Sequence, residues 1–481
     1  MLAAETSVEY YLILGLVILA LCSLNLIVLT LVRRFIPDRR LAVAKFADAE
    51  CPRVLVQLPL FNEGDLIERL LGAVMALDWP RDRLEIQVLD DSLDGSLAIS
   101  QRAVAALKQQ GVHIELLHRV QRTAFKAGAL AAGLERSKAP FVAIFDADFV
   151  PPPDFLRRTV GALVANPDLA YVQTRWGHLN RDESLLTRVQ ARLLDSHFGV
   201  EQEARWRLGL PLPFNGTCGL WRRAAIDSAG GWDGDTLTED LDLSLRATLA
   251  GWRSGFMGDL VVPGALPTSP RAWRVQQFRW TKGFAQCFIK LIPLVWRSRH
   301  LAAWQKLMIS FQIGQSLAFV VGVACLIMGL PFMAGAVVGG SGLSLVAFVT
   351  SFLGFVAPIA FLAQAGRGEG LHLTFIEILS ALVLTSGLLL SNARGGLEAL
   401  LGHRTEFVRT PKARDRKTGY APIWRNGALE LGAGLALLGF ALVEQPVAVL
   451  YLAMLIGGLV GIGAMQVIDG LDLARPASLR N

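Results

Sequence analysis

Long apolar segments on both sides of a polar central section limit what this 481-residue chain can fold into. Six such segments occur, at residues 10–32, 304–332, 343–362, 373–390, 428–443 and 447–468. A helix of about 20 apolar residues crosses a bilayer. The hydrophobic content of 53% is also high for a soluble enzyme. We therefore predict an integral membrane protein whose polar central section folds outside the bilayer.

The excess of basic residues, a formal net charge of +6, follows the apolar segments. Arg33, Arg34, Arg39 and Arg40 come directly after the first segment. Because lysine and arginine concentrate in the cytoplasmic flanks of membrane helices, we attribute the charge to topology and expect no nucleic-acid partner. No small-residue cleavage site follows the first segment, so we expect it to be retained as an anchor.

The basic stretches at residues 271–306 and 403–425 constrain the path of the chain through the membrane. Both are expected in the cytoplasm, so an even number of crossings should separate them. Three apolar segments lie between them, and one of these should therefore lie on the membrane or re-enter it. We favour residues 373–401, which carry Glu377 and Glu398, because ionisable groups are costly at the bilayer centre.

Strands alternate with helices through the first part of the polar section. The predicted strands are residues 53–60, 84–89, 113–117 and 141–145, and the predicted helices are residues 66–77 and 97–110. Such alternation is typical of a parallel sheet with helices on both faces, and ligands bind beyond the C-terminal ends of its strands. Three of the strands end in polar clusters: Phe61-Asn62-Glu63, Asp90-Asp91-Ser92 and Asp146-Ala147-Asp148. We therefore expect the ligand site at that edge.

Asp146 and Asp148 provide two carboxylates at one strand end. Together with a diphosphate, such hard oxygen ligands suit Mg²⁺ or Mn²⁺. An isolated Asp-x-Asp is often only a solvated turn, but this one follows a buried strand in register with the other acidic clusters. Asp91 is then expected to reach a nucleotide base or ribose. Lys126, on a glycine-flanked turn, is expected to neutralise a phosphate.

Thr238-Glu239-Asp240 precedes an amphipathic run at residues 241–249. The pattern is that of a helix N-cap with acids in the first turn, and capping alone accounts for Thr238 and one acid. The functional interpretation makes Asp240 a general base that deprotonates an acceptor hydroxyl. The chemistry of the two carboxylates does not by itself distinguish Glu239 from Asp240.

Arg279-Trp280 joins a permanent positive charge to a flat apolar face. Sugars stack on such faces, and arginine binds a diphosphate through two parallel hydrogen bonds. A tryptophan at the membrane surface is an equally good explanation, since membrane proteins favour it there. Upstream, the glycine-rich stretch at residues 214–219 would form the floor of an acceptor site.

Taken together, the motifs resemble a known family. Four of them match, in order and spacing, the D, DxD, TED and QxxRW motifs of processive family 2 glycosyltransferases: Asp90-Asp91, Asp146-Ala147-Asp148, Thr238-Glu239-Asp240 and Gln276-x-x-Arg279-Trp280. That group includes the cellulose, hyaluronan and chitin synthases. Within it the chain looks most like the cellulose-synthase-like A proteins, which make β-mannan and glucomannan, and their bacterial relatives. The resemblance covers roughly residues 50–425.

The resemblance implies an α/β fold of the GT-A type, a nucleotide-diphosphate sugar such as UDP-glucose or GDP-mannose, Mg²⁺ or Mn²⁺, and inversion at the anomeric carbon. Asp240, with Glu239 beside it, would be the catalytic acid pair. The donor would be held by Asp90, Asp91, Lys126, Asp146 and Arg279. The metal would be held by Asp146 and Asp148. The acceptor would be held by Asn215, Gly216, Gln276 and Trp280.

One further match and one departure concern the ends of the site. Residues 407–412 resemble the Phe-x-Val-Thr-x-Lys pattern of a cytoplasmic gating loop that closes over the nucleotide through Phe407, Thr410 and Lys412. The cellulose-synthase-like A pattern usually has Glu-Leu-Pro ahead of QxxRW, whereas this chain begins the same triplet with Ala265. The missing carboxylate bears on the acceptor site and on the identity of the donor.

These expectations divide the chain into six parts. They are an N-terminal transmembrane anchor at 1–36, a GT-A domain at 50–265, interfacial amphipathic helices with QxxRW at 266–303, transmembrane and interfacial helices at 304–401, a gating loop at 402–426, and a C-terminal transmembrane hairpin at 427–470. We expect the catalytic domain in the cytoplasm, attached to a bacterial inner (plasma) membrane.

The predicted function is transfer of a sugar to a growing polysaccharide and its translocation through the protein's own helices. Two alternatives remain open. One is a single-transfer enzyme that glycosylates a membrane lipid, although six apolar segments and the gating-loop match favour a polymerase. The other is a non-catalytic scaffold or export subunit, against which the intact acidic motifs argue.

Overall fold

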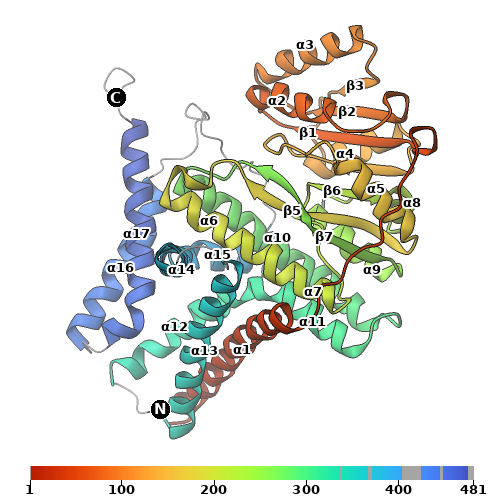
Figure 1. Cartoon of the computed structure of the whole chain (residues 1–481). Coiled ribbons are helices and arrows are strands. Elements are labelled where there is room, and N and C mark those ends of the chain that lie inside the picture. Colours follow the sequence, from red (N-terminus) through yellow and green to blue (C-terminus); the bar gives the residue numbers. More distant parts are fainter. Residues whose placement is uncertain (1, 336–338, 367–370, 404–423, 445–447, 475–481) are drawn as a thin grey trace.

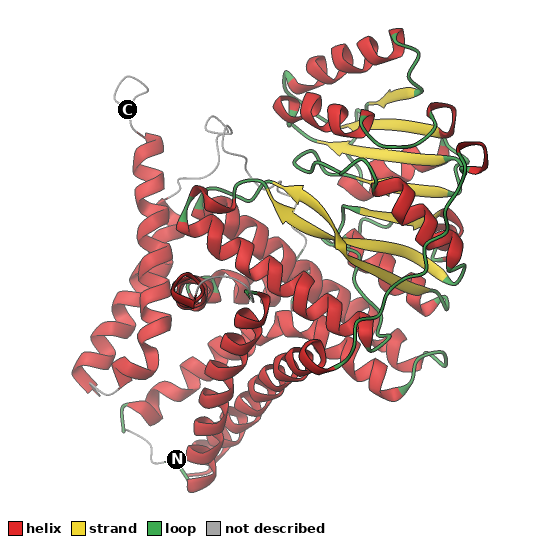
Figure 2. Cartoon of the chain, viewed as in Figure 1, coloured by secondary structure: helices red, strands yellow, loops and turns green. Residues whose placement is uncertain are grey.

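The computed structural model describes residues 2–335, 339–366, 371–403, 424–444 and 448–474. The sheet lies at one end of the molecule, and the long helices gather at the other (Figures 1 and 2). The strands are β1 (Val54–Leu60), β2 (Leu84–Asp90), β3 (Ile114–Leu117), β4 (Phe141–Ile144), β5 (Leu169–His178), β6 (Gly219–Arg222) and β7 (Arg253–Gly264).

The helices of the sheet domain are α2 (Gly64–Met75), α3 (Ser96–Gln109), α4 (Phe125–Glu135), α5 (Phe155–Ala165), α6 (Leu185–Ser196), α7 (Glu203–Arg207), α8 (Arg223–Ser228) and α9 (Glu239–Leu249). The helices outside the sheet domain are α1 (Leu2–Phe35), α10 (Pro270–Arg297), α11 (Ala303–Gly314), α12 (Ala318–Met333), α13 (Ser341–Ala365), α14 (Leu371–Ser386), α15 (Leu389–Leu400), α16 (Trp424–Glu444) and α17 (Ala448–Ala474).

The seven strands form one mixed sheet in the order β3-β2-β1-β4-β6-β5-β7. The prediction of the first four strands is confirmed to within a residue at each end, and they pair in parallel. The sheet as a whole is mixed, because β6, which the sequence did not predict, runs antiparallel to both β4 and β5. The start of β6 therefore lies at the edge where its neighbours end, which brings residues 214–217 to the expected ligand edge.

A buried pair of glutamines ties the sheet to the helix that carries Lys126. Gln57 and Gln87 face each other across β1 and β2, and the Gln57 Nε2 donates to the Gln87 Oε1 at 3.1 Å and to the Leu130 carbonyl at 3.1 Å. The Gln87 Nε2 donates to the Gly133 carbonyl at 2.9 Å. Because buried amides need partners, these bonds fix α4 over the sheet.

Four helical stretches in the described residues are long and apolar enough to cross a membrane: Ser7–Phe35, Ala303–Met333, Ser341–Ala365 and Leu452–Gly470. Residues 266–303, expected to hold several amphipathic helices, contain the single 28-residue helix α10. Its N-terminus is capped by Ser269, whose hydroxyl accepts from the Ala272 N–H at 3.2 Å, with Pro270 in the first turn.

Helices α14 and α15 form a bent pair with an angle of 49° between Thr374–Ser386 and Leu389–Leu400. Each helix of this pair forms an ion pair with a helix that precedes it in the chain. The Glu377 carboxylate pairs with the buried Arg192 of α6, and Glu398 pairs with Lys282 of α10 at 2.8 Å. The bent pair could be one broken span or a re-entrant segment, and entry of residues 373–401 into the membrane and their return stays a prediction.

Candidate active site

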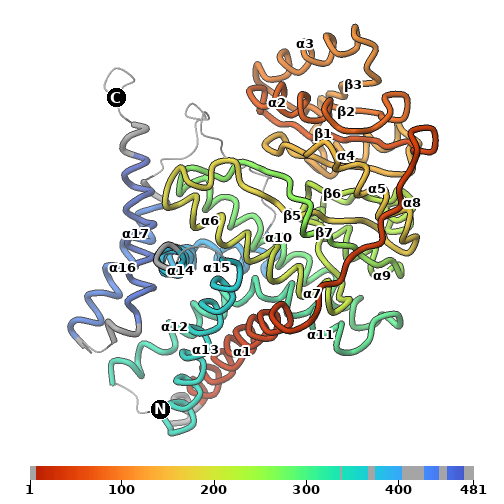
Figure 3. The backbone as a smooth tube through the Cα atoms, in the orientation of Figure 1, coloured from red at the N-terminus to blue at the C-terminus, as the bar shows by residue number. Residues whose placement is uncertain are grey.

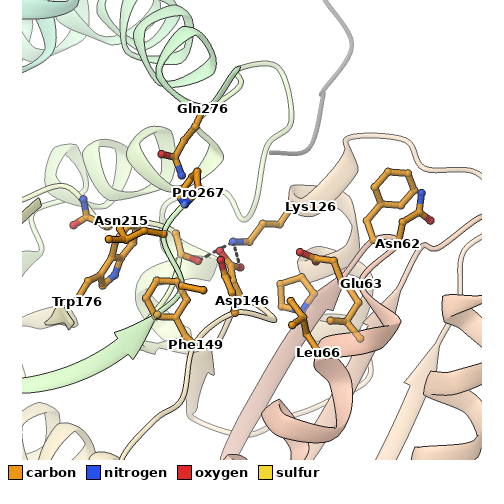
Figure 4. A pocket seen from close by; sticks show the side chains of 18 of the residues that line it. Asn62, Glu63, Leu66, Lys126, Asp146, Phe149, Trp176, Asn215, Pro267 and Gln276 are labelled. Atoms are coloured by element: carbon orange, nitrogen blue, oxygen red, sulfur yellow. Dashed lines mark hydrogen bonds and ion pairs between the residues drawn. The ribbon is translucent and has the colours of Figure 1, made fainter. Parts of the chain in front are cut away.

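A cavity of about 860 Å³ opens at the C-terminal ends of β1, β2 and β4, between the sheet and α10. Eleven of the residues singled out in the sequence line it together: Asp91, Lys126, Asp146, Asp148, Asn215, Gly216, Glu239, Asp240, Gln276, Arg279 and Trp280. Figure 4 places Asn62 and Glu63 on one side of Asp146, and Trp176 and Asn215 on the other. The predicted residues thus come together from six separate parts of the chain.

Of the two acids at the end of β2, Asp90 and Asp91, only Asp91 lines the cavity. Asp90 is fully buried, and its Oδ1 accepts from the Ser92 N–H at 2.8 Å. Asp91 is held by Arg119, whose Nε and Nη2 lie 3.0 Å and 2.5 Å from its two oxygens. A two-point arginine–carboxylate bond fixes the carboxylate plane, so Arg119 orients Asp91. Asp90 is placed to support the turn instead.

Lys126 is the cation at the centre of the cavity. Its Nζ lies 2.5 Å from the Asp146 Oδ1 and donates to the Gly216 carbonyl at 3.0 Å. The glycine-flanked turn expected around it is the first turn of α4, which begins at Phe125, and both Ala124 and Phe125 have positive φ. Burial alone would lower the pKa of Lys126, but the neighbouring Asp146 and Glu239 carboxylates outweigh it and raise that pKa.

The acid pair stands at the N-terminus of α9. Thr238 occupies the N-cap position as expected, but its hydroxyl makes no capping bond. That hydroxyl lies 3.4 Å from the Cys287 Sγ instead, because α10 packs directly against this end of α9. Glu239 is buried, and the Asp240 Oδ1 accepts from the Leu241 N–H at 2.8 Å.

The two acids resist ionisation. Burial, reinforced by the negative charge of Glu239, raises the pKa of Asp240 to about 7. Burial also raises the pKa of Glu239, although Lys126 and Arg279 oppose the shift. A carboxylate whose pKa lies near neutrality is suited to take up a proton at physiological pH.

Gly216 separates Asp240 from Lys126, and a side chain at its position would be strained and would displace Asp240. Its φ is +80°, and a Cβ atom there would lie 2.8 Å from the Asp240 Oδ2 and 3.6 Å from the Lys126 Nζ. The preceding Asn215 is fixed by its N–H, which donates to the Gln173 Oε1 at 2.9 Å. The close approach lets donor-side and acceptor-side groups share one small space.

Three residues of α10 form the opposite wall. Gln276, Arg279 and Trp280 are spaced three and four positions apart, which puts them on one face of a helix, and all three line the cavity. Burial lowers the pKa of Arg279, and the Glu239, Asp146 and Asp240 carboxylates oppose that shift. The guanidinium therefore stands in the field of the same acids that surround Lys126.

Asp146 and Asp148 are compatible with a divalent cation. Both line the cavity, and the Asp146 backbone is held in place because its N–H donates to the Thr217 hydroxyl at 2.8 Å. Their oxygens are hard ligands of the kind that Mg²⁺ and Mn²⁺ prefer. One Asp146 oxygen is engaged by Lys126, so a cation at this carboxylate would compete with the lysine.

Sequence reasoning missed several residues of the site. Arg119 orients Asp91, and Trp176 and His178 line the cavity from the end of β5. A signal for β5 is present in the sequence, since the apolar run at residues 169–172 is typical of a buried strand. Glu63, noted only as the end of a strand, lines the cavity as well. Ala265 lines it too.

The expected gating residues Phe407, Thr410 and Lys412 lie outside the described residues.

Comparisons with known proteins found similar glycosyltransferases. Residues 141–363 match the family model described as "Glycosyl transferase family group 2". Glucomannan 4-beta-mannosyltransferase 2 of Arabidopsis thaliana is 44% identical over 297 residues, which cover 59% of this chain and 56% of that protein. Glucomannan 4-beta-mannosyltransferase 1 of Oryza sativa subsp. japonica is 43% identical over 282 residues, covering 56% and 54%. The chain spans about half the length of these curated relatives.

A solved structure shares the fold. A mannosyltransferase from Pyrobaculum calidifontis, in complex with GDP-Man and Mn2+, superposes with a TM-score of 0.56 at 22% identity, over 82% of this chain and all of that one. This likeness confirms the predicted GT-A fold. The chain is thus similar to family 2 glycosyltransferases over residues 141–363, as its motifs indicated, and several of its helices are apolar enough to cross a membrane.

Proposed function

We propose that this protein is a membrane-embedded, inverting β-glycosyltransferase that extends a polysaccharide with sugar from a nucleotide-diphosphate donor and moves the product across the membrane. The observation that carries the proposal is the single cavity in which Asp240 faces Lys126 and Asp146 across Gly216. A base and a diphosphate site within a few ångströms are what inverting transfer requires.

Asp240 is the proposed base. The acceptor hydroxyl oxygen attacks the anomeric carbon and gives its proton to the Asp240 carboxylate. The bond between the anomeric carbon and the diphosphate breaks on the opposite face, and its electron pair leaves with the diphosphate. A pKa near 7 lets Asp240 accept this proton at neutral pH.

The donor side neutralises the leaving group. Lys126 and Arg279 supply positive charge on the cavity wall, and arginine can hold two phosphate oxygens at once. Asp91, oriented by Arg119, is proposed to bind the nucleoside. A divalent cation held by Asp146 and Asp148 would neutralise charge that develops on the diphosphate.

The acceptor side of the cavity provides an aromatic ring and two side-chain amides. Trp280 offers a face for a sugar ring, and Gln276 and Asn215 offer hydrogen bonds to its hydroxyls. We further propose that Phe407, Thr410 and Lys412 close over the nucleotide. On this proposal Lys412→Ala weakens donor affinity about tenfold, the effect of one charge-assisted contact. Unchanged donor affinity in that variant would refute the role.

GDP-mannose is the donor we propose first, with UDP-glucose as the second candidate. The support is that the similar plant proteins are named glucomannan 4-beta-mannosyltransferases, and that the Pyrobaculum structure holds GDP-Man and Mn2+. Ala265 is the point at which this chain differs from the related pattern inside the cavity.

The test is incorporation of radiolabelled sugar by the purified full-length protein. GDP-mannose and UDP-glucose are supplied in parallel with Mg²⁺ or Mn²⁺, Asp240→Asn serves as the blank, and the products are sized by chromatography. We expect a high-molecular-weight product from GDP-mannose. Label confined to a small lipid-soluble product would support the single-transfer alternative. No label from either donor would support the scaffold alternative.

A further inference from the structure

A second cavity, of about 580 Å³, lies where the C-terminal ends of α1 and α13 meet the sheet domain. Its polar lining is mainly basic. Four arginines contribute to it, Arg33 and Arg34 at the end of α1, Arg175 from β5 and Arg207 from α7, together with the acids Asp38 and Asp195. Figure 3 shows the chain leaving α1 here and running along the sheet domain.

The arginines are not equally engaged. Arg207 is committed to structure, since it pairs with Asp38 and its Nε lies 2.9 Å from Glu203. The side chain of Arg175 is 35% exposed, with one nitrogen, Nη2, 2.8 Å from Asp195. Arg34 is exposed, and no acidic side chain among the described residues pairs with it. Arg34 and Arg175 therefore retain donors that a bound anion can use.

The cavity stands at the expected level of lipid headgroups. Helices α1 and α13 run side by side, since the Thr350 hydroxyl donates to the Leu16 carbonyl at 3.1 Å and the Gly340 N–H to Glu9 at 2.9 Å. Exposed leucines continue along α1 as far as Leu31. Arg33 and Arg34 follow at once, so the arginines begin where the apolar surface ends.

We propose that this second cavity binds the phosphate of an anionic membrane lipid, with Arg34 and Arg175 as the main contacts. Basic cavities at the cytoplasmic ends of membrane helices suit such headgroups, and guanidinium groups bind phosphate oxygens in pairs. The ordinary positive flank of a membrane helix explains Arg33 and Arg34. It does not explain why Arg175, from a sheet strand, converges on the same space.

Asp195 connects the second cavity to the catalytic cavity. Asp195 Oδ1 lies 2.8 Å from the Arg175 Nη2 and 3.2 Å from the His178 Nε2, and His178 lines the catalytic cavity. A phosphate that draws Arg175 toward itself weakens the bond to Asp195 and leaves that carboxylate to His178. Lipid binding is therefore expected to alter the rate of sugar transfer. This inference goes beyond the proposed function and does not depend on the donor.

The test is binding of dioctanoyl phosphatidic acid to the full-length protein in a neutral detergent, measured by native mass spectrometry beside dioctanoyl phosphatidylcholine. We expect phosphatidic acid to bind about tenfold more tightly. The variant Arg34→Gln/Arg175→Gln should lose this preference, and Arg175→Lys should keep most of it. The matched control is Arg297→Gln/Arg299→Gln, which removes two exposed arginines at the end of α10 and should keep it fully.

Two results of the lipid comparison would overturn the proposal. One is equal affinity of the wild-type protein for the two lipids. The other is an equal loss of preference in the control variant, which would mean that any surface charge suffices. Glycerol 3-phosphate forms a third arm: binding as tight as that of phosphatidic acid would identify a soluble phosphate, not a lipid, as the occupant. Native secondary structure of each variant is checked by circular dichroism.

Discussion

Two carboxylate clusters flank the start of α9, and they are built for different purposes. In the first, Asp233, Asp235 and Asp242 bring their oxygens within 4.8 Å of one another, a spacing that a metal ion could use. Lys290 fills that space, with its Nζ 3.1 Å, 2.8 Å and 2.8 Å from the three. The acids and the lysine satisfy each other, so this cluster holds α10 against α9.

The second cluster, Glu239 and Asp240, is not neutralised in this way. The nearest lysine, Lys126, is bonded to Asp146, and both acids line the cavity. The pKa values differ accordingly: burial dominates at Asp240 and raises its pKa to about 7. At Asp233 burial is outweighed by the hydrogen bond and charge of Lys290, which lower the pKa. A carboxylate beside a cavity whose pKa stays raised indicates a catalytic role, whereas a carboxylate neutralised by a lysine indicates a structural role.

The largest expected difference between the clusters is catalytic. Asp240→Asn should lower the rate of sugar transfer by about 10³-fold or more, since it removes the base, while donor affinity stays within about twofold of the wild type. The matched control Asp235→Asn, in the saturated cluster, should change the rate less than about twofold. Steady-state transfer assays and donor titrations measure both. Turnover retained in Asp240→Asn, or lost in Asp235→Asn, would contradict the assignment of catalysis to the first of these acids and of a structural role to the second.

Alanine substitutions at Gly216 and Gly231 separate the steric effect of a new methyl group from the effect of backbone strain. Gly216→Ala should lower the transfer rate about 10²-fold, because the new methyl group displaces the Asp240 carboxylate. Gly231 has a similar φ of +74° with nothing within 4 Å of a Cβ. Gly231→Ala should therefore cost about 1–2 kcal/mol of stability from the left-handed backbone and leave the rate unchanged. Equal rate losses in the two variants would show that strain alone matters.

The pH profile should follow Asp240. Because the base must be deprotonated, the transfer rate should fall about tenfold per pH unit below pH 7 and level off above it. The matched variant Asp235→Asn should show the same profile. A rate that is level from pH 5 to pH 8 would exclude Asp240 as the titrating base.

The smallest effects are on stability, and they should have opposite signs. The folded-state pKa of Asp240 lies above its ordinary value of 3.8, so its contribution to stability falls as the pH rises from about 4 to 7. Asp240→Asn should thus raise the unfolding midpoint at pH 8 by about 2–4 °C. The pKa of Asp233 is lowered, so its contribution is present at pH 8 and is lost in acid.

Asp233→Asn should accordingly lower the unfolding midpoint at pH 8. The effect should not exceed about 2–4 °C, because Asp233 is 46% exposed and its bond to Lys290 is screened by water. Scanning fluorimetry of the two variants beside the wild type gives both values. A lower midpoint for Asp240→Asn would indicate that this acid stabilises the fold like Asp233.

The sequence predicted the site better than the sheet. Four strands followed from apolar runs, three of them with polar clusters after them, and eleven of the predicted residues meet in one cavity. The antiparallel strand β6 was not predictable, because its four residues are too few to show the apolar–polar alternation of a strand. Thr238 illustrates a further limit. Its hydroxyl contacts Cys287, a residue 49 positions further along the chain, and rules for local helix capping do not predict such a contact. Arg119 and His178 were missed because their roles depend on which strands become neighbours.

The most direct test of the account is a structure of the full-length Asp240→Asn variant with GDP-mannose and Mn²⁺, determined by electron cryomicroscopy in a nanodisc. The account predicts the diphosphate between Asp148 and Lys126, the nucleoside beside Asp91, and the anomeric carbon facing residue 240 with room for an acceptor hydroxyl between them. A donor bound elsewhere, or one whose anomeric carbon points away from residue 240, would contradict the assignment of Asp240 as the base.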